Sequence, residues 1–588
     1  PGIKKLIKDR QKACHNHDIP LWKCLRYKVQ EEIKQRKKSF YKNNVQHLKN
    51  SDSRKWWKII NKMSGKPGTT KPFTLERDGE ILNNLQASNA LNEFYISVNA
   101  DIPPLDVDLL PSFLPSNDSV PVVECYQVCK KLQSIHAFKA TGPDNISPRI
   151  LKEYAHVLAE PITIIFNTSL ASGVVPSGWK ESNIVPIPKT SKPTAEADTR
   201  PISLTSSLSK VLEDFVVSWL IEDVKEKIDP SQFGCLKGTS TTFCLLDMLH
   251  TWLSHLDGLG NHLRICFLDF SKAFDRIGYN LLIEKLIYLG ARRSLIPWII
   301  NFLSNRNQLV KFDGATSVWL SVNAGVPRGT KLGPILFLVM VNNLRITSPE
   351  TRMWKYVDDV SASECLSRNC TSITQSTLNS VQLWASDNWM KLNIKKCKEL
   401  RVSFLGETSQ LMPLLIDGHS IETVRSHKVL GLTIQNNLKW DEHIYEIVSK
   451  ASKRLHILRV LRRSGIPPAD LLTVYIALIR SILEYSCEVW HSSISCYLSD
   501  KIEKIQKRAL RIIYPEQTYK NALLLAGVTK LETRREDLCL KITRGGPLTQ
   551  YVTQTRSNEH NYFIRSLNNL STYKCRTDLW NARCPKII

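Results

Sequence analysis

Two adjacent carboxylates, Asp358 and Asp359, interrupt the otherwise apolar and aromatic stretch KYVDDV at residues 355–360. Because the side chains of a strand alternate between its two faces, neighbouring acids on a strand cannot both point the same way. A tight turn between two strands would present both at one rim, where they could hold a cation. An Asp-Asp pair is also ordinary chemistry for a surface hairpin, so the pair alone does not decide between a metal site and a simple turn.

A third acid, Asp269, ends the stretch HLRICFLDF at 262–270, in which large apolar residues alternate as in a buried strand. A carboxylate at that position is costly unless it meets a cation or another partner. Asp269 and Asp358, from two different strands, could together hold a pair of Mg²⁺ ions, since hard cations prefer oxygen ligands and two-metal sites suit in-line displacement at phosphorus. The Gly/Pro-rich turn at 325–333 lies between them in sequence, and its backbone could approach a nucleotide closely.

The elements that must position these acids lie in a mixed domain. Helical and strand patterns alternate from residue 122 to about 405, which indicates an α+β or α/β fold. Residues 281–290 are predicted to be an amphipathic helix with Gly290 as its C-cap, and an apolar helix is predicted at 335–344 after the Gly/Pro turn.

Helical patterns also flank this domain. A basic helix is predicted over 21–63, ending near Gly65, and a second over 446–465. A third is predicted over 499–515, with Ser499 as its N-cap.

The charge balance favours a phosphate-bearing partner. Lys and Arg total 80 against 55 acids, a net charge of +25, and residues 1–62 alone carry 18 basic and 5 acidic side chains. Nucleic acid is the natural partner of such a field. A solvated helix face, or a nuclear-import signal around 34–38, remains open for the basic N-terminal stretch.

Composition excludes several classes of protein. A hydrophobic content of 42% is typical of globular chains, and 588 residues should divide into three or more units. The apolar run at 334–341 is far too short to span a membrane. Fifteen scattered cysteines without a CxxC pair indicate reduced thiols, and hence a protein of the nucleus and cytoplasm. The segment CHNHDIPLWKC at 14–24 lacks a second ligand pair at zinc-finger spacing.

The order of strand acid, Gly/Pro turn with helix, and aromatic-x-Asp-Asp is more specific than any of its parts. The segments FLDFSKAFDRI, GVPRGTKLGPILF and YVDD resemble motifs A, B and C of reverse transcriptases, and are most similar to those of non-LTR (LINE-type) retrotransposons of the jockey and chicken-repeat-like groups. Further stretches resemble that family in the same order: 139–152, 179–189, 200–213, 232–238, 389–399, 427–444, 478–494 and 502–515. The resemblance covers nearly the whole chain.

The resemblance implies an α+β right-hand polymerase, with fingers, a palm containing an antiparallel sheet and a helical thumb, between a basic helical N-terminal extension and a helical C-terminal region. The expected domains are a basic linker at 1–66, a connector at 67–121, reverse transcriptase fingers and palm at 122–406, a palm–thumb junction at 407–445, a thumb at 446–530 and a C-terminal region at 531–588.

The family pattern also implies roles for the acids. Asp269 and Asp358 would be metal ligands, with the backbone carbonyl of Phe270, and Asp359 would support the placement of metal or primer. Two Mg²⁺ ions are the expected cofactors, with Mn²⁺ as a substitute. Lys396 or Lys398 would protonate the leaving pyrophosphate; the motif register leaves both open.

Five further residues would bind the incoming dNTP. Lys189 and Arg200 would meet its triphosphate, and the ring of Phe274 would collide with a ribose 2′-OH and so favour deoxynucleotides. Gly329 would let the turn approach the nascent base pair. Arg328 stands where the family usually has Gln and could touch nucleotide phosphates or base edges.

The expected function is therefore RNA-directed DNA polymerisation by a non-LTR retrotransposon enzyme. Its partners would be an RNA template, a DNA primer and dNTPs, within a ribonucleoprotein containing the element RNA and without a membrane. We expect no N-terminal endonuclease domain in this chain, and no CCHC knuckle near Cys575 and Cys584.

Two other classes stay open. One is a catalytically inactive retroelement remnant that binds RNA or DNA. The other is a different template-directed enzyme, such as a maturase-like reverse transcriptase or an RNA-templated RNA polymerase. Phe274 argues against ribonucleotide use, and the segments 427–444 and 478–515 argue against a maturase.

Overall fold

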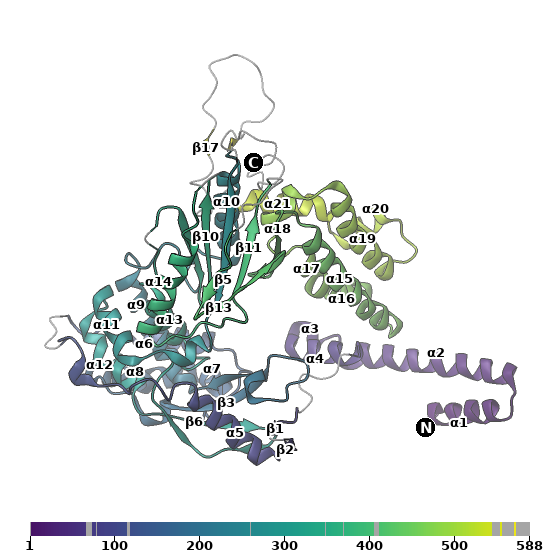
Figure 1. Ribbon diagram of the computed structural model, residues 1–588. Helices are drawn as coiled ribbons and strands as arrows, with labels where there is room; N and C mark the ends of the chain where they lie inside the picture. Colours follow the sequence, from purple (N-terminus) through teal and green to yellow (C-terminus); the bar gives the residue numbers. More distant parts are fainter. Residues whose placement is uncertain are drawn as a thin grey trace. The chain divides into compact units, whose positions relative to one another are not determined.

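The computed structural model describes residues 2–65, 73–77, 79–113, 118–258, 260–346, 348–367, 370–404, 411–543, 553–554 and 570–571. The chain divides into two compact units (Figure 1). The central unit comprises residues 72–244 and 258–425, and the terminal unit comprises 1–71, 245–257 and 426–588. Cys575 and Cys584 lie outside the described residues.

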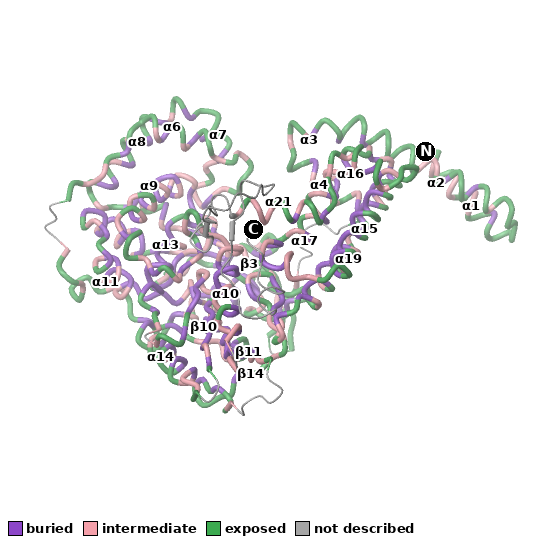
Figure 2. Tube along the Cα trace, turned by 90° about the horizontal axis from the view of Figure 1, so that it is seen from above, coloured by how far each residue is buried: buried purple, intermediate pink, exposed green. Residues whose placement is uncertain are grey.

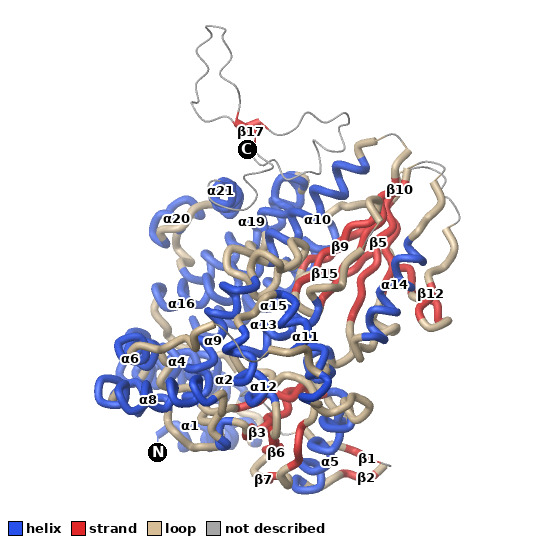
Figure 3. Tube along the Cα trace, turned by 90° about the vertical axis from the view of Figure 1, so that its left-hand side faces the viewer, coloured by secondary structure: helices blue, strands red, loops and turns tan. Residues whose placement is uncertain are grey.

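The main sheet of the central unit has five strands in the order β14-β11-β5-β10-β9. Its strands β5, β9 and β10 are labelled in Figure 3. They are β5 (His262–Asp269), β9 (Thr351–Tyr356), β10 (Asp359–Leu366), β11 (Lys398–Val402) and β14 (Glu422–Val424). Strand β10 is antiparallel to β5 and β9, and β11 is antiparallel to β5. The predicted buried strand ending at Asp269 is confirmed.

A second sheet contains β3 (Glu181–Pro188), β4 (Thr199–Leu204), β6 (Arg306–Phe312), β7 (Ala315–Thr316) and β8 (Leu320–Val322). The short strands of this unit are β1 (Glu76–Arg77), β2 (Glu80–Ile81), β12 (Leu415–Ile416) and β13 (His419–Ser420). Its helices are α5 (Asn84–Ser97), α6 (Cys125–Ser134), α7 (Pro148–Glu153), α8 (Ala155–Ser172), α9 (Ser207–Val224), α11 (Tyr279–Leu289), α12 (Ile296–Leu303), α13 (Leu332–Val341) and α14 (Thr374–Asp387). This mixture of helix and sheet confirms the α+β expectation.

One face of the main sheet packs on helices. Cys266 and Leu268 of β5 and Val360 of β10 belong to one apolar core with residues of α9, α11 and α13. Nearly every residue of α13 is buried (Figure 2), which fits its uniformly apolar sequence. Since side chains alternate along a strand, Asp269 lies on the opposite face from Leu268.

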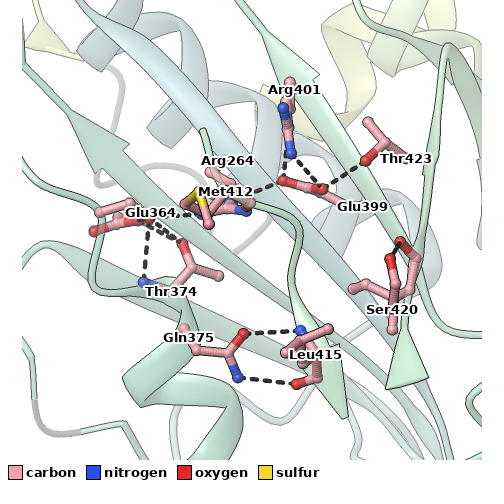
Figure 4. Close-up of polar contacts among 12 residues, drawn as sticks. Arg264, Glu364, Thr374, Gln375, Glu399, Arg401, Met412, Leu415, Ser420 and Thr423 are labelled. Atoms are coloured by element: carbon pink, nitrogen blue, oxygen red, sulfur yellow. Dashed lines mark hydrogen bonds and ion pairs between the residues drawn. The ribbon is translucent and has the colours of Figure 1, made fainter. Parts of the chain in front are cut away.

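A buried polar network fixes the register of this sheet (Figure 4). The Arg264 guanidinium on β5 lies 2.6 Å from a carboxylate oxygen of Glu399 on β11, and both side chains are almost fully buried. Thr423 and Arg401 also donate to Glu399. A slip of one residue would move these charges to the other face of the sheet, so the network specifies the pairing.

The terminal unit contains α1 (Gly2–His15), α2 (Ile19–Asn44), α3 (Leu48–Ser51), α4 (Ser53–Met63), most of α10 (Thr241–Leu256), α15 (Asp441–Arg463), α16 (Pro468–Tyr475), the π-helical turn Ile476–Arg480, α17 (Ser481–Leu483), α18 (Cys487–Trp490), α19 (Cys496–Ile513), α20 (Tyr519–Ala526) and α21 (Leu531–Thr543). Its strands are β15 (Ser426–Val429), β16 (Leu432–Gln435), β17 (Thr553–Gln554) and β18 (Leu570–Ser571). No helix among the described residues is long and apolar enough to cross a membrane.

The predicted helix over 21–63 is three helices, α2 to α4, anchored to α16. The Tyr41 hydroxyl donates to Asp470 at 2.8 Å and accepts from the Trp56 indole at 3.0 Å, while Lys49 pairs with the same aspartate at 2.8 Å. The apolar face of α2 therefore packs within the unit, and Trp56 is buried.

Most of the other predicted helices are confirmed with shifted ends. Helix α11 ends at Leu289, and its C-cap is Gly290 as predicted, with a left-handed φ of 85°. Helix α13 begins three residues before the predicted start. Ser499 is not an N-cap: α19 begins at Cys496, and Ser499 is buried within it, accepting a hydrogen bond from Arg535 at 2.7 Å.

Candidate active site and basic groove

The three acids lie at one end of the main sheet. Asp359, the first residue of β10, lies directly opposite Asp269, the last residue of β5. Asp358 occupies the two-residue turn, with Val357, that joins β9 to β10. Opposed residues of an antiparallel pair have Cβ atoms about 5 Å apart, so the carboxylates of Asp269 and Asp359 share one small region.

The electrostatics of this end of the sheet favour a bound cation. The pKa of Asp359 is raised to about 6, first by loss of hydration and then by the negative charges of Asp358 and Asp269. The ammonium of Lys396 lies 3.1 Å from a carboxylate oxygen of Asp269 and partly offsets this repulsion. Because that lysine is largely exposed, it can swing away when a stronger cation arrives.

The carboxylate and carbonyl oxygens at this end of the sheet are ligands that suit a hard divalent cation. The backbone groups flanking Phe270 are engaged, since Asp269 O accepts from Asn393 N and Ser271 N donates to Lys391 O. Neither bond uses the Phe270 carbonyl. Among the described residues no three His, Cys, Asp or Glu side chains converge on one point, so a site built here needs backbone, water or substrate oxygens as well.

Basic residues predicted to bind the triphosphate gather beside these acids. Lys189 follows β3 and Arg200 lies in the paired strand β4. The pKa of Lys189 is lowered, first by desolvation and then by the positive charges of Lys396, Arg200 and Arg328. Four cations from separate segments are thus close enough to repel one another. The negative charge of a bound polyphosphate would reduce this repulsion.

Phe274 and Arg328 are in contact. The Phe274 ring stacks on the Phe337 ring, with 4.6 Å between the two centroids. The guanidinium carbon of Arg328 lies 5.3 Å from the Phe274 centroid. Arg328 also pairs with Asp275 at 3.2 Å. Burial raises the pKa of Asp275, and the positive charges of Arg328 and Lys272 oppose that rise. Arg328 is therefore held in place and partly neutralised.

Gly329 is required by a close approach within the protein. Its φ is 128°, and a Cβ atom there would lie 2.5 Å from the carbonyl oxygen of Ser203 on β4. The neighbouring Arg328 carbonyl accepts from Ser203 N at 2.7 Å. The turn thus packs against β4, the strand that carries Arg200, which couples the two predicted nucleotide-binding segments.

The two candidate proton donors are separated by the structure. Lys396 reaches Asp269, whereas Lys398 begins β11 and pairs with Glu422 of the neighbouring strand β14 at 2.7 Å. Lys396 alone of the two is therefore brought to the acids.

Several contributors were missed by the sequence analysis. Lys272 is half-buried with its ammonium 4.1 Å from the Phe94 centroid, and burial lowers its pKa to about 8. Glu213 is buried on α9 and accepts from the backbone amides of Lys331 and Leu332, which caps the start of α13. Both residues lie within stretches that resemble the family, but only their distant contacts identify these roles.

A basic groove lies within the terminal unit. Its volume is about 590 Å³, and it is lined by Lys34 of α2, Arg459, Arg462 and Arg463 of α15, and Arg508, Arg511 and Ile512 of α19. None of the described residues that line it is acidic. Six positive charges without an acid among them suit a phosphodiester backbone.

Comparisons with known proteins agree with the resemblance. Residues 187–434 match the family model described as "Reverse transcriptase (RNA-dependent DNA polymerase)". The chain is 27% identical over 456 residues to the RNA-directed DNA polymerase from mobile element jockey of Drosophila melanogaster, covering 73% of this chain and 47% of that protein. It is 25% identical to the probable RNA-directed DNA polymerase from transposon BS of the same organism, covering 73% and 49%. The chain thus spans about half the length of these curated relatives.

Among solved structures, telomerase from Candida tropicalis with a fragment of telomeric RNA aligns at a TM-score of 0.35 and 14% identity, over 66% of this chain and 62% of that one.

Proposed function

From its reverse transcriptase domain over residues 187–434, we propose that this chain is the RNA-directed DNA polymerase of a non-LTR retrotransposon. The observation that carries the proposal is the pairing of Asp269 with Asp359 beside the turn acid Asp358, opposite a cluster of cations. Carboxylates that can bind metal ions, and cationic side chains that can bind a triphosphate, lie together at one end of the sheet. This arrangement suits the transfer of a nucleotide to a primer 3′-hydroxyl.

In this reaction the primer 3′-oxygen forms a bond to the α-phosphorus of a dNTP, and pyrophosphate leaves. Two Mg²⁺ ions, held by Asp269, Asp358 and the Phe270 carbonyl, would supply an activated hydroxyl and neutralise the leaving group when bound. Mn²⁺ would substitute. Asp359 supports the placement of metal and primer through its position opposite Asp269.

The chain's other residues bind and orient the dNTP. Lys189 and Arg200 contact its phosphates, and Arg328 orders the turn beside them through Asp275. Phe274 stands against the sugar and excludes a 2′-hydroxyl. Lys396, whose ammonium lies at Asp269 before metal binds and is displaced from it afterwards, donates a proton to the departing pyrophosphate.

The partners follow from this role: an RNA template, a DNA primer and dNTPs, in a ribonucleoprotein with the element RNA in the nucleus and cytoplasm. The basic groove of the terminal unit would follow a phosphate backbone. The groove requires no base-specific contact, because the template supplies the sequence information.

Primer extension on two templates tests the proposal. The purified chain is given oligo(dT) annealed to poly(rA) or to poly(dA), with Mg²⁺ and either dTTP or UTP. We expect extension on poly(rA) with dTTP and little incorporation of UTP. Binding of the hybrid with steep salt dependence, but no extension under any condition, would instead favour an inactive nucleic-acid-binding remnant.

A further inference from the structure

The turn that carries Asp358 has a strained backbone. Val357, the first residue of that turn, has a φ of 59°. Left-handed backbone is unfavourable for any residue with a Cβ atom, and particularly for a β-branched one such as valine. Such a conformation persists only where surrounding structure imposes it, and it is found preferentially at functional sites. Some contact must therefore hold Val357 in place.

One buried side chain supplies that contact. The Gln232 side-chain oxygen accepts hydrogen bonds from Val357 N at 3.1 Å and from Gly234 N at 2.8 Å. Gln232 is almost fully buried, at 4% exposure, so these bonds are shielded from water. A single acceptor thus joins the segment 232–234 to the first residue of the metal-binding turn.

Backbone pairing brings the two segments into that position. Lys355 N donates to Ser231 O, and Phe233 N donates to Lys355 O, both at 2.8 Å. The segment then approaches so closely that a Cβ atom on Gly234 would lie 2.5 Å from Val357 Cγ2 and 2.6 Å from Val357 N. Position 234 therefore requires glycine, and the turn has no room to relax toward the segment.

Lys355 reinforces the same contact. Its ammonium is fully buried, lies 2.6 Å from a carboxylate oxygen of Asp229, and donates to the carbonyls of Val341 and Leu344 at 3.0 Å each. Asp229 precedes Gln232 in the same segment. The ion pair of Asp229 with Lys355 therefore fastens this segment to β9, and the hydrogen bond of Gln232 fastens it to Val357 in the turn after β9.

We infer that Gln232 is a positioning residue for nucleotidyl transfer. It holds Val357 in the left-handed conformation that presents Asp358 to the proposed metal site, which Asp358 shares with Asp269. The inference rests on the proposed function for its kinetic consequence, but not for its structural one. Without the acceptor, two amides lose their partner and Val357 can relax, which moves the residue that follows it.

Hydrogen exchange of the metal-free protein tests the structural part without any activity. In Gln232→Met, which keeps size but removes the acceptor, the amides of 355–359 should exchange at least tenfold faster. Gln375→Met is the matched control, because the Gln375 side chain also bonds backbone groups, those of Leu415, away from the acids (Figure 4). It should leave the 355–359 amides unchanged. Equal exchange in parent and Gln232→Met would overturn the inference, whatever the enzyme does.

Magnesium titration of primer extension tests the kinetic part. Gln232→Met should raise the Mg²⁺ concentration for half-maximal extension at least fivefold and lower kcat, with the KM for primer–template unchanged. Glycine adopts a positive φ freely, so in a Val357→Gly background the same substitution should shift the Mg²⁺ requirement less than twofold. An equal shift in both backgrounds would contradict a role through Val357. If Gln232→Met fails to fold, Gln232→Asn, which draws the amide back by one methylene, replaces it in both measurements.

Discussion

Asp359 and Asp269 face one another across the β10–β5 pair, and five residues further along the same two strands Glu364 faces Arg264. The register that places the two site acids opposite each other is therefore the register of a buried polar network. Like charges directly opposite in a sheet repel, so the site end of this pair is held together by the packing and polar contacts at its other end.

Breaking the buried pair should destabilise the protein. In Arg264→Met, Glu399 loses its 2.6 Å partner inside the sheet but keeps its bonds from Arg401 and Thr423, and we expect the free energy of unfolding to fall by about 1–3 kcal/mol. Urea unfolding followed by circular dichroism measures the change. The control Arg149→Met removes an exposed ion pair with Glu153 and should leave the midpoint in place. An unchanged midpoint for Arg264→Met would show that the pair does not hold the sheet.

The raised pKa of Asp359 predicts a pH-dependent stability. In the folded protein the pKa of this carboxyl is about 6, above its ordinary value, so its unfavourable charge is nearly absent at pH 4, half present at pH 6 and nearly complete at pH 8. Asp359→Asn should therefore raise the melting temperature of the metal-free protein at pH 8 but not at pH 4. Because the side chain is exposed, solvent screening limits the gain to about 1 kcal/mol.

Saturating Mg²⁺ is the control for that prediction. A bound cation would neutralise the same repulsion, so the advantage of Asp359→Asn at pH 8 should shrink or reverse when the metal is added. An advantage that is equal at both pH values, and is indifferent to Mg²⁺, would contradict the shared charge of the three acids.

Phe274 should control sugar selection. Phe274→Val removes the ring that stacks on Phe337 and lies near the Arg328 guanidinium, and so leaves room for a 2′-hydroxyl. We expect the ratio of kcat/KM for dTTP over UTP to fall at least tenfold, in the range typical of one steric contact. General damage to the enzyme would lower kcat/KM for dTTP and kcat/KM for UTP together and leave their ratio unchanged. A ratio equal to that of the parent would therefore contradict a role of Phe274 in sugar selection.

The basic groove should govern the salt dependence of binding. Each phosphate contact contributes close to one unit to the slope of log K against log salt, so Arg459→Gln with Arg462→Gln should reduce the slope by about 2 on an RNA–DNA hybrid. The matched control is Lys428→Gln with Lys450→Gln, two lysines of the same unit already paired with Glu446. Equal changes in the two double variants would mean that net charge, and not the groove, sets binding.

Local patterns in the sequence predicted the local structure well. The alternation of 262–268 predicted a buried strand, and Gly290 predicted the end of α11, because both depend on neighbouring residues. The prediction of Ser499 as the N-cap was wrong. The helix begins one turn earlier, at Cys496, and Ser495 is its N-cap. The start of α19 at Cys496 shows that Ser499 is internal, and there it accepts a hydrogen bond from Arg535.

Long-range contacts account for what the sequence could not predict. Lys396 and Lys398 are equivalent by motif, and the pairing of β11 with β14 is what assigns Lys398 to Glu422. Gln232, Glu213 and Lys272 act through residues more than a hundred positions away. The close approach that requires Gly329 is likewise to a different strand, β4.

The most direct test of the account compares two Asp→Asn variants in single-turnover addition of dTMP to oligo(dT) on poly(rA). Asp358→Asn removes the proposed metal ligand, whereas Asp417→Asn removes an acid from the turn between β12 and β13, where the backbone is left-handed and asparagine is well tolerated. We predict a rate at least a thousandfold lower for Asp358→Asn, about 4 kcal/mol in the barrier, with hybrid binding retained and Asp417→Asn like the parent. A rate within tenfold of the parent for Asp358→Asn would contradict the assignment of this turn as the catalytic metal site.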